Sequence, residues 1–309
     1  MTQPTSPRIA IVTGADAKFL PMAGALPQSL GDAGWRGDVR ICDFGLTDRQ
    51  AGILREAGIL LSRPARLAPG IHPFFYKAAL VDYVAALDFD VLVWIDSDMI
   101  ALDDVAPALG DLAAQLAAQG RKAALSADAG VASIAEACAR LDMRPFQDAL
   151  ARAGIGTDRP YLNTGLVAIA DRGVLAAWRD LAFSIPAHAL FEQNAFNLLV
   201  HDGRCPAMLV PAARWNVHGP LLAAATQGAE GGIVVGDQRA VLVHATSAQA
   251  SQHEIHDGAV RLTGGVFDAQ LKLFRNPVLR TRQVAALNRW SLDPVAQACA
   301  VQPRRHGAA

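Results

Sequence analysis

The sequence predicts an α/β protein built on a mainly parallel sheet that is flanked by helices. Between Arg8 and Ile95, short runs of β-branched and apolar residues alternate with longer stretches whose apolar residues recur at helical spacing. Such alternation is typical of β-α-β units, in which the crossover helix makes consecutive strands parallel. The expected strands are 9–12, 39–42, 59–61 and 91–95, and the expected helices are 19–30, 47–57 and 74–87.

The second half of the chain has a weaker pattern. Alanine-rich segments 103–119 and 133–140 are expected helices, and 161–170 is expected to be a turn that enters another buried strand. Beyond Pro211, the glycine-rich segment 228–236 and the polar segment 246–258 are expected to be surface loops. Residues 302–309 are expected to be a frayed tail.

Composition indicates a globular protein that acts on a small molecule. The chain has 309 residues, of which 52% are apolar and 18% charged, and its net charge is -1. That charge gives no overall field for binding nucleic acid or anionic lipid, so an anion site must be built locally. No secretory signal is predicted, and the apolar runs are shorter than the roughly 20 residues of a membrane span. The four cysteines lack C-x-x-C spacing, which favours reduced thiols and a cytoplasmic location.

Two aspartates directly follow the apolar run 91–95. Asp96 and Asp98 are two residues apart on an extended segment, so both carboxylates share a face at the edge of the sheet where open α/β proteins bind ligands. Oxygen ligands suit a hard cation, either Mn²⁺ or Mg²⁺, and a diphosphate could complete its coordination. The alternative interpretation is a turn or a helix cap formed by Asp98. A second D-x-D, at 88–90, precedes the strand and is interpreted as a solvated turn.

The stretch from Phe75 to Leu109 resembles the central block of glycogenin-like and bacterial lipopolysaccharide glycosyltransferases. The resemblance implies a Rossmann-like type-A glycosyltransferase fold and metal-dependent transfer of a sugar from a nucleoside diphosphate, with UDP favoured, to a hydroxyl acceptor. Lys77 occupies the position of a basic residue that touches the donor diphosphate, although taken alone it could be a surface lysine. Ser97 is placed with the donor-binding residues.

Two further blocks resemble the same family. Thr13, Asp16 and Phe19 match the loop that holds the nucleotide base, where Phe19 could stack on uracil or could be a core residue. The family usually has tyrosine at that position. Asn163 opens an N-[ST]-G block beside the donor sugar, and its amide could bind sugar hydroxyls or only form a local turn. Gly165 would let the backbone approach a ligand closely.

The segment 192–197 is similar to the family's D-Q-x-x-x-N motif on a helix. The resemblance makes Gln193 face the anomeric carbon, and Asn197 shares its helical face, whereas Glu192 is expected to point elsewhere and to favour the helix N-terminus. Trp215 lies in a block near the acceptor pocket and could contact a sugar ring or fill the core.

His244 ends a late apolar run, as the family's third metal ligand does. The family continues H-x-x-G-x-x-K, but this chain has neither that glycine nor that lysine. A second phosphate contact is therefore in doubt, and His253, His256 and Lys272 are left open as replacements.

The resemblance covers residues 8–245, so 1–245 is predicted as the transferase domain and 246–309 as its loop and helical extension. Retention of the anomeric configuration is favoured, and inversion would need a base such as Asp128 or Glu192. Partners would be a nucleotide-sugar donor and a glycan, lipid or small-molecule acceptor. Two alternatives stay open: a haloacid-dehalogenase-like phosphatase with Asp96 as nucleophile and Asp98 as general acid, and a non-catalytic nucleotide-sugar-binding module. The sugar and the oligomeric state are not predicted.

Overall fold

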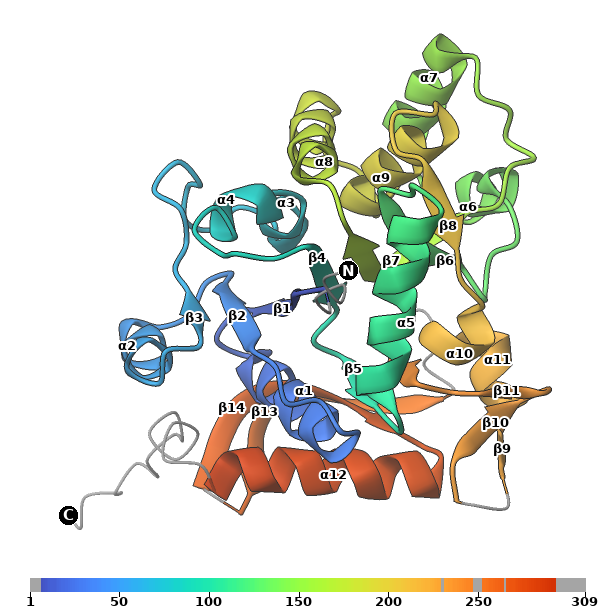
Figure 1. Ribbon diagram of the computed structural model, residues 1–309. Coiled ribbons are helices and arrows are strands. Elements are labelled where there is room, and N and C mark those ends of the chain that lie inside the picture. The colour runs from blue at the N-terminus through green and yellow to red at the C-terminus, as the bar shows by residue number, and fades with distance from the viewer. Residues whose placement is uncertain (1–6, 229–230, 247–251, 264, 293–309) are drawn as a thin grey trace, which may run out of the picture.

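The computed structural model describes residues 7–228, 231–246, 252–263 and 265–292, and it is centred on a seven-stranded sheet (Figure 1). In spatial order the strands are β3 (Leu60–Leu61), β2 (Val39–Asp43), β1 (Ile9–Ala15), β4 (Val91–Ile95), β7 (Leu162–Ile169), β6 (Ala123–Ala127) and β8 (Ala207–Leu209). Neighbouring strands are parallel except at β7, which runs antiparallel to both β4 and β6. The predicted α/β class and mainly parallel sheet are confirmed.

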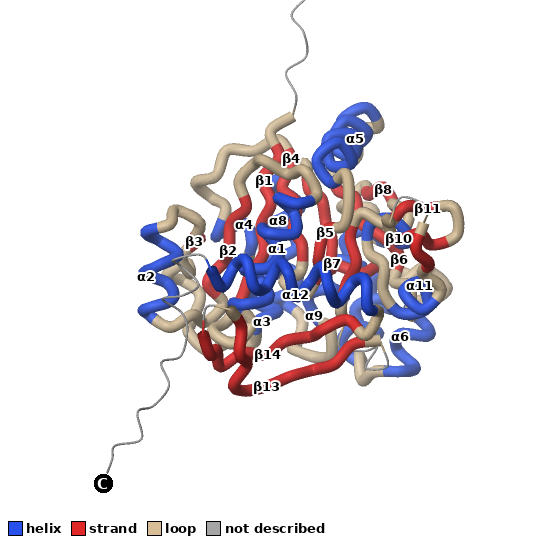
Figure 2. The backbone as a smooth tube through the Cα atoms, turned by 90° about the horizontal axis from the view of Figure 1, so that it is seen from below, coloured by secondary structure: helices blue, strands red, loops and turns tan. Residues whose placement is uncertain are grey.

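Helices cover both faces of this sheet (Figures 1 and 2). Their bounds are α1 (Leu20–Asp32), α2 (Asp48–Glu56), α3 (Pro73–Ala78), α4 (Leu80–Tyr83), α5 (Val105–Ala118), α6 (Ile134–Arg140), α7 (Arg144–Ala153), α8 (Arg172–Ser184), α9 (Phe191–His201), α10 (Ala212–Trp215), α11 (Gly219–Ala223) and α12 (Pro277–Leu292). Because side chains alternate along a strand, β4 contributes to two cores. Leu92 and Trp94 join the core under α8 and α9, while Val93 joins the core under α1 and α5.

The burial of β4 on both faces determines where the chain can place polar groups. All five residues of β4 are buried, and the chain becomes partly exposed only at Asp96. It then continues as β5 (Met99–Ala101), which pairs antiparallel with β12 (Leu242–His244). A late segment of the chain thereby lies beside the carboxyl end of β4.

The early helices largely match their predictions. Thr47 caps α2 through a capping box in which Gln50 donates its backbone N–H to Thr47 and accepts from the Thr47 backbone N–H. The helix expected at 74–87 is instead two short helices, α3 and α4, which meet at Ala79.

The interpretation of 246–258 as a surface loop was wrong in its second part. β13 (His253–Leu262) forms a ten-residue antiparallel hairpin with β14 (Gly265–Phe274). Half of the residues of β13 are exposed and its sequence has no apolar run, whereas β14 supplies the apolar face. Within 228–236, β10 (Ile233–Val235) likewise pairs with β9 (Thr226–Gln227) and with β11 (Gln238–Arg239). The tail at 302–309 lies outside the described residues.

The C-terminal hairpin and α12 pack against α1, so that the first and last described helices lie side by side. Phe267 and Leu271 of the hairpin and Trp290 of α12 share a core with Leu20 of α1. The extension is thus packed on the first β-α unit, although the domain boundary at residue 245 stays a prediction.

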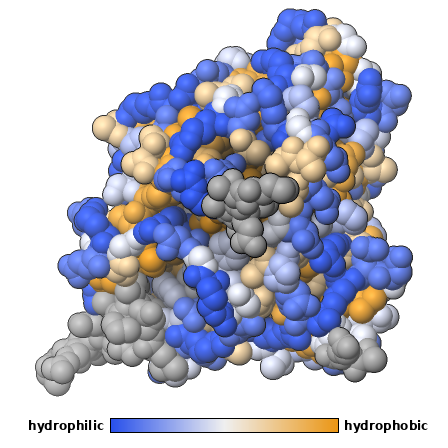
Figure 3. Space-filling model, in the orientation of Figure 1, coloured by the Kyte–Doolittle hydropathy of each residue, from blue (hydrophilic) through white to orange (hydrophobic). Residues whose placement is uncertain are grey.

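The described surface is mixed. Hydrophilic residues cover much of the face in Figure 3, and apolar residues reach the surface in patches between them. Within the described ranges, no helix is both long enough and apolar enough to cross a bilayer. Cys42, Cys138 and Cys205 are free thiols.

Close packing of α1 on α12 predicts an unusual response to alanine. A Cβ at Gly24 would lie 2.0 Å from the indole of Trp290, whereas a Cβ at Gly110 in α5 would meet nothing within 4 Å. Gly24→Ala should therefore destabilise the protein by about 1–3 kcal/mol, the usual cost of overpacking. Gly110→Ala should be neutral or stabilising by up to about 1 kcal/mol, because alanine favours a helix. Urea unfolding of both variants measures this, and equal effects would contradict the packing.

Candidate functional site

Three side chains from separate segments converge at the carboxyl end of β4. Asp96 follows β4, Asp98 precedes β5, and His244 ends β12. One ligand atom from each lies within 4.8 Å of the others. The His244 Nε2 atom is 3.1 Å from Asp98 Oδ1 and 3.8 Å from Asp96 Oδ2. Backbone hydrogen bonds hold this geometry, because the N–H of Asp96 donates to the carbonyl of Gly165 and the N–H of Ala245 donates to the carbonyl of Asp98.

A chain of buried amides fixes which nitrogen of His244 carries a proton. Asn163 Oδ1 accepts from the backbone N–H of Gly165, and Asn163 Nδ2 donates to Asp128 Oδ2, so the orientation of this amide is set at both ends. Asn216 must then present Nδ2 to Asn163 Oδ1, at 2.8 Å, and turn Oδ1 toward His244 Nδ1, at 2.9 Å. His244 therefore donates from Nδ1 to Asn216, and its Nε2 atom faces the two carboxylates.

This arrangement fits a divalent cation. Two carboxylates and a neutral imidazole supply three ligand atoms, and the other ring nitrogen of a metal-binding histidine usually donates to an oxygen as it does here. A Cβ at Gly165 would lie 2.6 Å from the His244 ring. The glycine was expected to admit a ligand, but the space it leaves is filled by His244.

Lys77 lies in the same site. It is 5% exposed, and its Nζ donates to Asp96 Oδ1 at 2.8 Å and to Thr164 Oγ1 at 3.2 Å. Glu192 Oε1 is 3.5 Å from the same ammonium. Burial alone would lower the pKa of Lys77, but Asp96 and Glu192 outweigh burial and raise it. The surface-lysine alternative is therefore wrong, while contact with a phosphate stays a prediction.

Glu192 was misplaced by sequence reasoning. It is 2% exposed beside Lys77, its Oε2 atom has no partner among the described residues, and burial raises its pKa despite the nearby ammonium. The sequence argument assumed that α9 has one buried face. The structure buries every residue from Phe191 to Leu199, so neighbouring positions both point into the protein.

Gln193 and Asn197 do lie along one side of α9. Gln193 Oε1 accepts from the backbone N–H of Thr164 at 3.1 Å. Asn197 holds the helix against β7, because its amide accepts from the N–H of Leu162 and donates to the carbonyl of the same residue. Asn197 is thus a structural residue, and the placement of Gln193 at an anomeric carbon stays a prediction. Both ends of the Asn163 amide already have protein partners, and its role toward a sugar is also still a prediction.

The residues expected to hold a nucleotide base lie next to this site. Thr13 is fully buried and its Oγ1 has no partner among the described residues. Asp16 Oδ1 accepts from the backbone N–H groups of Lys18 and Phe19, so one of its oxygens holds the loop that enters α1. Ser97 is half-buried in the turn between β4 and β5. The base-binding and donor-binding roles of these residues stay predictions.

Of the three residues left open as a replacement for the missing lysine, the structure brings Lys272 to the site. Its Nζ lies 2.6 Å from Asp98 Oδ2 and 5.4 Å from the ring centroid of Phe19. His256 is exposed beside Glu254, and His253 is buried with Nε2 unpartnered among the described residues. Burial alone would raise the pKa of Asp98, but His244 and Lys272 together hold that pKa well below its usual range. No motif marks Lys272, which follows the region of resemblance.

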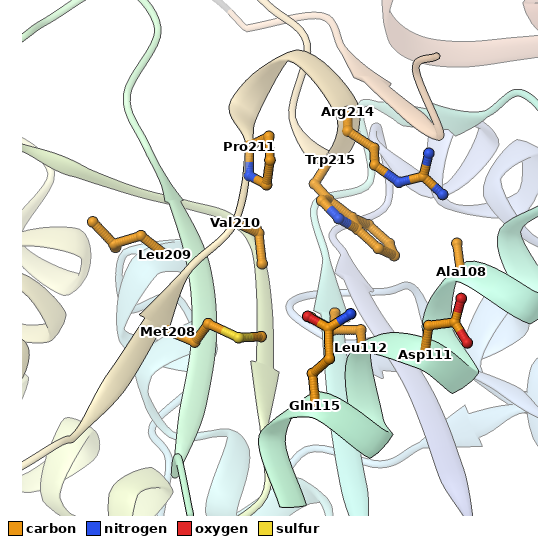
Figure 4. Close-up of a pocket in the computed structure, with 10 residues that line it drawn as sticks. All are labelled: Ala108, Asp111, Leu112, Gln115, Met208, Leu209, Val210, Pro211, Arg214 and Trp215. Atoms are coloured by element: carbon orange, nitrogen blue, oxygen red, sulfur yellow. The ribbon is translucent and has the colours of Figure 1, made fainter. Parts of the chain in front are cut away.

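Trp215 belongs to the core and also lines a separate hollow. It is 5% exposed and packs with residues of the sheet and α5. Figure 4 shows its ring facing a pocket between α5, β8 and α10, with Asp111, Gln115 and Arg214 at the rim. None of the metal-site residues lines this pocket. Contact of Trp215 with an acceptor sugar stays a prediction.

Comparison with known proteins gives likenesses of structure alone. No family model matches the sequence, and no curated protein matches it. Three solved structures that resemble the chain are the bifunctional glycosyltransferase WbbM, the galactosyltransferase LgtC and the glycosyltransferase GlyE of Streptococcus pneumoniae TIGR4. They are glycosyltransferases, the class that the sequence resemblance names.

These likenesses are remote. WbbM is 13% identical with a TM-score of 0.46 over 70% of this chain, which spans only 41% of WbbM. LgtC is 16% identical with a TM-score of 0.45, over 76% of this chain and 86% of its own. GlyE is 16% identical with a TM-score of 0.43, over 68% of this chain and 46% of its own. An activity for this chain must therefore rest on its own site.

The buried His218, next to this site, should make the stability of the fold sensitive to acid. It is 3% exposed, its ring lies 5.8 Å from that of His244, and burial lowers its pKa from 6.5 to about 4. Because the unfolded chain then binds the proton more tightly, His218 contributes stability above pH 6.5 that is lost as the pH falls to about 4. The full contribution is on the order of 3 kcal/mol.

The measurement is the free energy of unfolding of wild type and His218→Gln at several pH values. The wild type should lose more stability than the variant between pH 6.5 and about 4. His256→Gln, which removes an exposed histidine, should follow the wild type. Parallel curves for wild type and His218→Gln would show that burial does not hold His218 neutral.

Proposed function

We propose that this chain is a metal-dependent glycosyltransferase that moves a sugar from a nucleoside diphosphate, UDP being favoured, to a hydroxyl of a glycan, lipid or small-molecule acceptor. Asp96, Asp98 and His244 would hold Mn²⁺ or Mg²⁺. The observation that carries the proposal is the convergence of these three ligands at the carboxyl end of β4, where His244 donates from Nδ1 to Asn216 and its Nε2 atom faces both carboxylates.

The site supports this chemistry by its charges. A bound divalent ion would act as a Lewis acid that neutralises the leaving diphosphate. Lys77 pairs with Asp96 and Lys272 pairs with Asp98, so the site holds two further cations that would bind phosphate oxygens. Gln193 and Glu192, whose Oε2 atom has no partner among the described residues, would supply hydrogen-bonding groups for the hydroxyls of the sugar.

Retention of the anomeric configuration is the favoured course. Asp128, one candidate base for inversion, accepts from the backbone N–H of Gly130 at one oxygen and from Asn163 at the other. Glu192, the second candidate, is buried beside Lys77. The configuration of the product, read by NMR, distinguishes retention from inversion.

Replacing both metal-site carboxylates tests the proposal. Asp96→Asn/Asp98→Asn should abolish the rise in melting temperature that UDP gives with Mn²⁺, and should lower hydrolysis of a nucleotide sugar by at least about 100-fold, because metal catalysis contributes several kcal/mol. The matched control is Asp88→Asn/Asp90→Asn, which alters the other D-x-D pair, where both carboxylates contact Arg8 at the surface. That control should behave as wild type.

Other outcomes would support the alternatives. Release of phosphate from a phosphomonoester, blocked by beryllium fluoride, would indicate a phosphatase with Asp96 as nucleophile. Nucleotide binding without hydrolysis or transfer would indicate a binding module. The first alternative is disfavoured because β4 follows several β-α units, and the second because Lys272 supplies a cation that the sequence motif lacks.

Asn216 gives an independent test of the metal site. Asn216→Leu removes the acceptor for His244 Nδ1–H, and it should weaken Mn²⁺ binding by about 10–100-fold, as loss of such partners does elsewhere. Asn216→Asp keeps an acceptor and should bind Mn²⁺ more nearly as wild type does. Titration calorimetry measures both affinities. Equal loss in the two variants would mean that Asn216 acts only through packing.

A further inference from the structure

Lys272 is a buried cation that the family motif does not explain. It is 8% exposed on β14, and its ammonium lies 2.6 Å from Asp98 Oδ2. An ammonium removed from water is costly unless it is paired, so the contact with Asp98 holds Lys272 in this position. The C-terminal hairpin therefore inserts a positive charge into the cluster of metal ligands.

Both oxygens of Asp98 are already engaged. Oδ2 faces Lys272, and Oδ1 lies 3.1 Å from His244 Nε2. A divalent ion bound by Asp98 would lie within a few ångströms of the ammonium, where two cations repel strongly in a partly dry site. Lys272 and a metal ion consequently compete for the same carboxylate.

The hairpin fixes the backbone of Lys272 and leaves its side chain able to turn. Gln283 of α12 is fully buried, donates to the carbonyl of Lys272 at 2.8 Å and accepts from the N–H of Phe274 at 3.0 Å. Only the four-carbon stem separates this anchored backbone from Asp98. A lysine ammonium on such a stem can change partners without movement of the strand.

We propose that Lys272 is an internal counter-cation, which pairs with Asp98 while no divalent ion is bound and transfers to the donor's diphosphate when the ion enters. This inference rests on the proposed function. Because the diphosphate gives the displaced ammonium a new partner, nucleotide and metal ion each strengthen binding of the other, and this coupling is equal in both directions. The ion alone binds weakly, since it must first displace Lys272.

The test measures Mn²⁺ affinity of wild type and Lys272→Met by titration calorimetry, without and with saturating UDP. Without UDP, the variant should bind Mn²⁺ at least about fivefold more tightly than wild type, the lower end of usual coupling between sites. With UDP, that advantage should vanish, and the variant should bind UDP more weakly than wild type in the presence of Mn²⁺. Lys272→Arg keeps a cation and should retain the weak Mn²⁺ affinity of wild type.

Arg261→Met is the matched control, because it removes an exposed cation from β13 of the same hairpin. It should leave both affinities unchanged. If Lys272→Met folds less stably, Mn²⁺ alone should raise its melting temperature by more than that of wild type, since the ion then replaces the missing charge.

Weaker or unchanged Mn²⁺ binding by Lys272→Met without UDP would overturn the inference, and so would a wild type that binds no Mn²⁺ even with saturating UDP. Tighter Mn²⁺ binding by the variant, with no influence of UDP on either protein, would uphold the competition between Lys272 and the ion. That result would instead count against the nucleotide-dependent function.

Discussion

The site at the end of β4 is stable only if the electrostatic repulsion among the carboxylates gathered there is compensated. Asp98 and Glu192 are buried and Asp96 is partly buried beside them, so their like charges destabilise one another more than they would in water. Each is compensated by a cation or a donor brought from elsewhere in the chain: Lys77 from α3 pairs with Asp96, and Lys272 from β14 pairs with Asp98. The need to neutralise these acids links the first β-α units to the last hairpin.

The sheet topology makes that link possible. β4 is central and apolar on both faces, so polar side chains lie only beyond its ends, and Asp96 and Asp98 follow its carboxyl end. β7 runs antiparallel beside it, which places the start of β7, with Asn163 and Thr164, at the same edge. β12 reaches that edge through its pairing with β5 and delivers His244. One edge thus receives side chains from segments that are distant in sequence.

Much of this could be predicted from the sequence, and the remainder failed for identifiable reasons. The strands through β4 were recognisable because buried parallel strands are continuous apolar runs, and Asp96 and Asp98 were recognisable because they follow such a run. His244 was selected by the family resemblance, which has its third metal ligand at the end of a late strand. Glu192 was misplaced because α9 is buried on all sides, so helical periodicity does not separate its faces. Lys272 could not be selected, because it lies beyond the region of resemblance and its position beside Asp98 follows only from the pairing of β13 with β14 and their packing.

Asn216 shows a different limit. Asn216 follows Trp215 in a block that the family resemblance identified, yet its importance lies in the direction of its side-chain amide. A hydrogen-bond chain through Asn163 to Asp128 sets that direction. No local pattern encodes such a chain, because its members come from three separate segments.

The position of Lys272 on the last hairpin has a consequence for biosynthesis. A ribosome produces the chain from its N-terminus, so Asp98 and His244 leave the exit tunnel before Lys272 and before the Gln283 that anchors it. The acidic edge therefore exists for a time without its second ammonium.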